Sequence, residues 1–158
     1  MKSVVASTIF ALLAHTCANA KQPKATLRAH VEGNENDGAV FSTQLRSPAT
    51  GKNVTIEKIP TISERDVAAF YPVPAADGSL GVLFKLSDHG KLALDTLSLE
   101  KRGTYLYIFV NGRPSAELQI DRRITDGQLF VPTGLRPADI ELMKKEWRLI
   151  GQKKKKAR

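Results

Sequence analysis

The chain has 158 residues, a formal net charge of +8 and a single cysteine, Cys17. One cysteine excludes an internal disulfide. Because it precedes the predicted cleavage site described below, the mature protein has no cysteine nucleophile or metal ligand either. Much of the positive charge lies in residues 153–158, so the overall charge does not indicate a specific nucleic-acid-binding surface.

Residues 1–20 have the pattern of a secretory signal peptide. Lys2 supplies a positive start, and residues 4–14 form an apolar run too short to span a bilayer as a stable helix. Small residues then precede a predicted cleavage site after Ala20. Cys17 gives a lipoprotein as the minority alternative, although its preceding residues make a poor lipobox. We therefore expect an exported protein, periplasmic or extracellular, with no transmembrane segment after cleavage.

After a basic, mobile leader at residues 21–24, one domain is expected over residues 25–151. Hydrophobic alternation and extended runs bounded by turn signals predict several strands in its first part. They cover residues 25–32, 40–45, 54–59, 70–74 and 81–86. Ser63 and Asp66 have the spacing of a capping box, which predicts a short helical turn between the third and fourth of these strands.

The spacing of apolar residues predicts a first helix that starts at Ser87 or Asp88 and runs to about Arg102. Gly90 in its first turn lowers helix stability by about 1 kcal/mol relative to alanine. Its presence there indicates close packing against a neighbouring segment.

Asn111-Gly112, between two extended runs, is the strongest hairpin signal in the chain. A two-residue turn pairs Val110 with Arg113 and Phe109 with Pro114. Continued without interruption, this register puts a set of apolar side chains on one face, which we interpret as the core face rather than a base-stacking platform. The set is Tyr105, Tyr107, Phe109, Ala116, Leu118 and Ile120. The first strand reads as central, and Pro114 predicts an edge for the second.

A short strand is predicted over residues 128–131, ended by Pro132, and a second helix follows. Arg136 is the expected cap and Pro137 the first helical residue. Gly151 is expected to end this helix. The apolar stripe that it should bury consists of Ile140, Met143, Trp147 and Ile150.

Several segments between residues 63 and 147 resemble one known family when they are taken together. They are residues 63–67, residues 82–86 with Gly90, residues 106–114, Ile124 before Gly127, and residues 129–135 leading into the last helix. The set resembles the first periplasmic head domain of the SecD/SecDF protein-translocation subunit. That family usually has Asp-Gly at the hairpin turn, where this chain has the physically equivalent Asn111-Gly112.

The resemblance implies an α+β fold, with an antiparallel or mixed β-sheet and two helices packed on one face. It does not carry over the translocase activity. The family drives transport from a proton-conducting membrane half, and we expect no such half in this chain.

Two kinds of polar candidate were weighed as sites. Arg122 and Arg123 could bind an anionic ligand with two guanidinium groups, but a charged strand edge that blocks aggregation is the favoured interpretation. Asp88-His89 is interpreted as a helix cap beside an exposed histidine rather than as an acid–base pair, and His30 as a solvated residue. The residues lack the ligand spacing of a zinc site, so no metal and no cofactor are predicted.

The C-terminal segment, residues 152–158, is strongly basic and is expected to be disordered, because like charges repel and bury nothing. Its cations are Lys153, Lys154, Lys155, Lys156 and Arg158. The sharper hypothesis is a weak electrostatic tether to an anionic surface, to which each cation contributes about 1 kcal/mol.

If the tether exists, the full chain should co-sediment with anionic vesicles more than a chain ending at Gln152. The difference should shrink from low to moderate salt, because ions screen the attraction. Equal co-sedimentation of the two proteins at low salt would contradict the tether.

Taken together, the sequence predicts an exported, non-enzymatic binding or interaction module whose partners are envelope or exported proteins. Two alternatives stay open: an envelope enzyme of unrecognised type, and a protein that binds anionic surfaces through its lysine-rich tail.

Overall fold

The computed structural model describes residues 24–152. The predictions for the signal peptide, Cys17, most of the leader and the basic run from Lys153 lie outside these residues. In chain order the helices and strands are β1 (Leu27–Val31), α1 (Gly38–Phe41), β2 (Ser42–Arg46), β3 (Asn53–Glu57), β4 (Ile62–Ser63), β5 (Val67–Pro74), β6 (Leu80–Leu86), α2 (Asp88–Glu100), β7 (Tyr105–Val110), β8 (Arg113–Gln119), β9 (Gln128–Leu135), α3 (Pro137–Glu146) and β10 (Arg148–Leu149).

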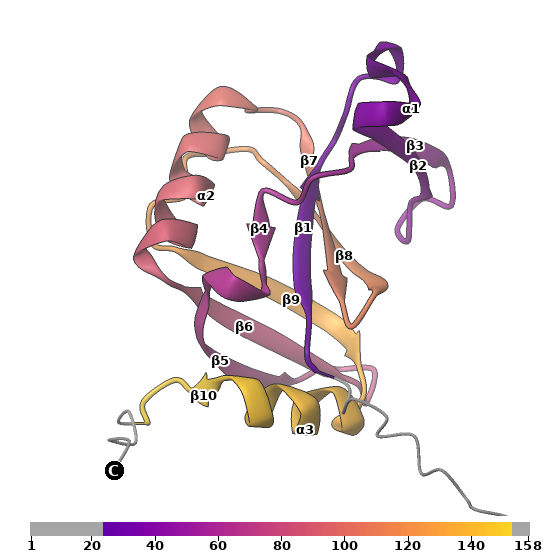
Figure 1. Cartoon of the computed structure of the whole chain (residues 1–158). Coiled ribbons are helices and arrows are strands. Elements are labelled where there is room, and N and C mark those ends of the chain that lie inside the picture. The colour runs from indigo at the N-terminus through magenta and orange to yellow at the C-terminus, as the bar shows by residue number, and fades with distance from the viewer. Residues whose placement is uncertain (1–23, 153–158) are drawn as a thin grey trace, which may run out of the picture.

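The predicted α+β class, with antiparallel and mixed pairing, is confirmed, and the strands divide between two four-stranded sheets. The first has the order β4-β1-β7-β8 and the second β10-β5-β6-β9, while β2 and β3 form a separate hairpin. All neighbours are antiparallel except β10, which pairs parallel to β5. In Figure 1, α2 stands along one side of the molecule and α3 lies below the second sheet, so the two helices lie on different sides of the molecule.

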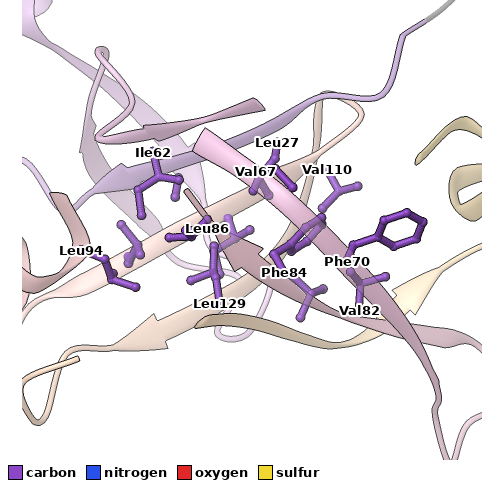
Figure 2. Packing of buried hydrophobic residues seen from close by; sticks show 14 of the residues in the cluster. Leu27, Ile62, Val67, Phe70, Val82, Phe84, Leu86, Leu94, Val110 and Leu129 are labelled. Atoms are coloured by element: carbon purple, nitrogen blue, oxygen red, sulfur yellow. The ribbon is translucent and has the colours of Figure 1, made fainter. Parts of the chain in front are cut away.

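One hydrophobic core draws side chains from both sheets and from α2 and α3. Leu27, Ala29 and Val31 of β1 are buried, as their alternation predicts. Figure 2 shows side chains of the first sheet lying beside Phe70 and Phe84 of the second. Burial of this apolar area is the main stabilising contribution to the fold.

An aromatic contact joins the end of α3 to the second sheet. The ring of Trp147 packs edge-on against Phe84, with centroids 5.9 Å apart, and against Phe70 at 6.4 Å. Such edge-to-face pairs are favourable because the positive ring edge meets the negative ring face. This contact fixes the chain where it leaves α3 and enters β10.

The hairpin of β7 and β8 forms at the predicted turn, where both Asn111 and Gly112 have positive φ. Val110 pairs with Arg113 as predicted, and Phe109 with Pro114. β7 is central and β8 is an edge strand, as expected.

The register predicted for β8 beyond Pro114 is wrong. A bulge makes Ile108 pair with Ala116, whereas the uninterrupted register pairs it with Ser115. One extra residue in β8 reverses the faces of all later residues in that strand. The core side chains of β7 are therefore Leu106, Ile108 and Val110. The aromatic residues of β7 point to the other face of the sheet, so Phe109 and Leu118 are not buried together.

Other element boundaries also differ from the predictions, and β5 begins at Val67 rather than at residue 70. Residues Gly38–Phe41 form a helical turn, so β2 begins at Ser42. β9 continues through Pro132, because it is an edge strand whose pairing with β6 is locally irregular. α3 ends at Glu146 rather than at Gly151, and the residues after it turn away to pair with β5.

Candidate functional site: a groove beside α2

A groove of about 390 Å³ lies between α2 and the segment that follows β3. Leu97 and Val31 are buried in its lining, whereas Leu92 is 65% exposed. Ile59, in the loop between the two groove residues Glu57 and Thr61, is 77% exposed. Exposed apolar side chains beside a groove are typical of surfaces that contact another molecule.

Polar groups lie along the same groove. Lys101, the residue directly after α2, has its Nζ 3.7 Å from Glu57 Oε1 of β3, so an ion pair links the two walls. Both side chains are well exposed, and such pairs contribute about 0–1 kcal/mol to stability. The pair therefore adds little to the stability of the groove.

The start of α2 is held by a hydrogen-bonded cluster around Asp66, whose carboxylate is largely buried. It accepts hydrogen bonds from the backbone N–H of Ser63 at 2.8 Å, the hydroxyl of Ser63 at 3.0 Å and Nδ1 of His89 at 2.7 Å. Ser87, one of the two predicted caps, caps the helix by accepting from the N–H of Gly90. Burial raises the pKa of Asp66, but these hydrogen bonds outweigh it and hold the pKa below its usual value.

Gly90 explains how α2 approaches this cluster so closely. An alanine Cβ at this position would lie 2.7 Å from the Cβ of Asp66, closer than side-chain atoms can pack. The predicted reason for this glycine, close packing, is therefore confirmed. The same contact sets the position of the helical wall of the groove.

The Asp66–His89 pair has the hydrogen bond of an acid–base pair, yet its geometry is that of a structural link. His89 is 82% exposed, and the hydroxyl of Ser63 donates to the carboxylate instead of facing the imidazole. Asp88, the residue weighed as the histidine's partner, is not its partner. Within residues 24–152 no group of three potential metal-ligating side chains occurs.

The structure places the other predicted polar candidates as follows. Arg123 donates two hydrogen bonds to Asp95, at 2.5 and 2.8 Å, which holds the pKa of that carboxyl below its usual value. Arg122 and Arg123 both line one cavity beside β8 and β9. An anion that used both guanidinium groups there would have to compete with Asp95 for Arg123. His30, expected to be solvated, is half-buried: its Nδ1 lies 2.8 Å from the carbonyl oxygen of Glu57 and its ring packs edge-on against Phe109.

A second buried carboxylate, Asp139 at the start of α3, was missed by the sequence interpretation. It accepts hydrogen bonds from Asn111 Nδ2 at 2.9 Å, Arg113 Nη2 at 2.6 Å and the backbone N–H of Arg136 at 2.9 Å. These bonds join the tip of the β7–β8 hairpin to α3. Asn111 therefore serves both the turn and this contact.

Comparison with known proteins bears on the fold. No model of a known protein family matches this chain, and no curated protein does. A structure of SecDF, described as a membrane component that enhances protein export, matches with a TM-score of 0.56 and 17% identity. The match covers 81% of this chain and 65% of the matched chain. SecDF in a super-membrane-facing form matches with a TM-score of 0.55 and 16% identity, over 80% of this chain and 19% of that chain.

These matches confirm the predicted SecD/SecDF head-like fold and extend it beyond residues 63–147. At this identity the likeness concerns the fold alone. This chain spans less than two thirds of the length of either matched chain. Among the helices between residues 24 and 152, none has the length and apolar character needed to cross a membrane.

Proposed function

We propose that this domain is an exported, non-enzymatic interaction module that binds extended segments of other exported polypeptides in the groove beside α2. The observation that carries the proposal is the exposure of Leu92 beside an apolar groove whose helical wall is fixed by Asp66. The fold shared with SecDF, a component that enhances protein export, supports exported polypeptides as the class of partner.

The size of the groove favours an extended segment over a helical one. An α-helix with its side chains is about 10–12 Å across, which is large for this groove. An extended chain can instead insert single apolar side chains against Leu97 and Ala93 of α2. Its polar backbone would then meet Thr61 and Glu57 on the opposite wall.

Replacing Leu92 with lysine should weaken binding of a fluorescein-labelled peptide of alternating leucine and serine by about tenfold. That factor corresponds to about 1.4 kcal/mol, less than the free energy of burying one leucine side chain. Fluorescence anisotropy with the full chain measures the change. Because Leu92 is exposed, the substitution should leave the thermal unfolding midpoint nearly unchanged.

Tyr71→Lys is the matched control, since Tyr71 is also an exposed apolar side chain, 53% accessible, but lies on β5 away from the groove. This variant should bind the peptide like the unaltered protein. Equal losses in the two variants would indicate non-specific hydrophobic adsorption and overturn the proposal, as would unchanged binding by Leu92→Lys.

A further inference from the structure

The face of the first sheet that carries the aromatic residues of β7 borders another cavity, of about 400 Å³, beside the β2–β3 hairpin. We propose that this cavity binds an organic cation, namely an ammonium or guanidinium group at the end of an apolar stem. Tyr105 and Tyr107 supply its rings, with centroids 6.4 Å apart. Glu32 and Glu117 supply its carboxylates, and Ser47 and Thr50 of the hairpin loop also line it.

The two carboxylates are held in place without being neutralised. Glu32 Oε2 accepts from the backbone N–H of Tyr105 at 3.2 Å. Glu117 Oε1 accepts from the hydroxyl of Ser47 at 2.5 Å and from the N–H of Ala49 at 3.2 Å. Within residues 24–152 neither glutamate forms an ion pair with lysine or arginine, and the second oxygen of each has no hydrogen bond. Two negative groups on one cavity favour a positive ligand.

Tyr107 is the second observation, and it is independent of the acidic pair. Its side chain is buried, with only 3% of the residue exposed, and its hydroxyl forms no hydrogen bond with another described residue. The hydroxyl oxygen is not itself among the fully buried unpartnered atoms of the described residues, so it stays accessible, and a ligand in the cavity can reach it. Burial, together with the charges of Glu32 and Glu117, raises the pKa of Tyr107 to about 12. The phenol therefore stays neutral and can accept a hydrogen bond from a cation.

The two carboxylates and the two tyrosines together favour a cationic ligand with an apolar stem. An anion would be repelled by both glutamates, and a purely apolar group would leave the Tyr107 hydroxyl and two carboxylate oxygens unpaired. A cation is attracted by the carboxylates and by the faces of the tyrosine rings, while its apolar stem packs against Val54 of β3. The cavity lies apart from the groove beside α2, with which it shares no lining residue.

The test is an NMR titration of the ¹⁵N-labelled full chain with N-acetyl-lysine-methylamide, and with N-acetyl-norleucine-methylamide as the uncharged match. Saturable shifts at the amides of Glu32, Tyr105 and Tyr107 are expected with the lysine probe only. A parallel titration with butylamine distinguishes the two sources of such a cation. If the lysine probe binds more tightly, the natural ligand is a basic side chain of a polypeptide. If butylamine binds more tightly, the natural ligand is a free amine. Equal shifts with norleucine, or lysine shifts elsewhere only, would overturn the proposal.

Variants separate the site from general electrostatics. Glu32→Gln keeps an oxygen for the N–H of Tyr105 and should weaken lysine binding at least tenfold. Glu35→Gln makes the same change of charge at an exposed residue that does not line the cavity, and should have no effect. Tyr107→Phe keeps the ring but removes the hydroxyl, and it should weaken binding about threefold. It replaces Glu32→Gln as the test variant if Glu32→Gln does not fold. Equal losses in Glu32→Gln and Glu35→Gln, or full affinity in Tyr107→Phe, would contradict the site.

Discussion

Replacing Gly81 with alanine is expected to lower the free energy of unfolding by about 3 kcal/mol, the upper part of the range for overpacked sites. Gly81 is buried in β6, where the backbone of β9 passes unusually close. An alanine Cβ would lie 2.7 Å from the carbonyl oxygen of Val131 and 2.8 Å from the carbonyl carbon of Pro132. Both are backbone atoms, so no side-chain rotation relieves the clash, and β9 must move away from the core. Urea unfolding followed by circular dichroism measures the loss.

The control for this substitution is Lys85→Ala in the same strand. Lys85 is exposed, so its truncation should change the unfolding free energy by no more than about 0.5 kcal/mol. If Gly81→Ala were as stable as this control, the close approach of β6 and β9 would be wrong.

Asp139→Ala should lower the free energy of unfolding by about 3 kcal/mol, because it removes one partner of a buried charged network. The loss would leave the N–H of Arg136 and the amide of Asn111 without their acceptor. Arg113 is 41% exposed and can regain water, which keeps the effect at the lower end of the usual range. Thermal and urea unfolding measure it, and Glu141→Ala on the exposed side of α3 is the control.

The same network predicts a pH dependence. Burial raises the pKa of Asp139, but hydrogen bonds from Arg136, Asn111 and Arg113 outweigh it, so the folded pKa lies below the usual value. The stabilisation is therefore fully present above the unfolded pKa of about 3.9, and it is lost as the pH falls through the folded pKa. Asp139→Asn should flatten the acid side of the stability profile, and an unchanged profile would contradict the network.

The β7–β8 hairpin shows how far sequence reasoning reaches. The turn at Asn111-Gly112 is specified locally by two residues that tolerate positive φ, and it was predicted correctly. The face that is buried was not, since β7 is apolar on both sides and only the bulge at Ser115 decides the register of β8. Because both faces of β7 are apolar, the hydrophobic pattern does not show which face β8 should match. It therefore cannot reveal an extra residue in β8.

The candidate sites were less accessible to prediction, because their parts are distant in the sequence. Ser63 and Asp66 were recognised as a capping box, but nothing local indicates that His89 would join them. Asp139 received no prediction, because nothing local indicates that it binds the hairpin tip. The rings of Tyr105 and Tyr107 were assigned to the core, which follows directly from the wrong register.

The placement of β10 has a consequence for when the domain can fold. Arg148 and Leu149 complete the second sheet by pairing with Ala69 and Phe70, and β1 reaches across to β7 to complete the first. Both sheets thus depend on contacts between residues that are far apart in the sequence. Such contacts form slowly because long loops must close first. A chain that lacks its last segments leaves the edge of β5 open. The second sheet therefore stays incomplete until Arg148 and Leu149 are available, whereas the first sheet needs no residue beyond β8.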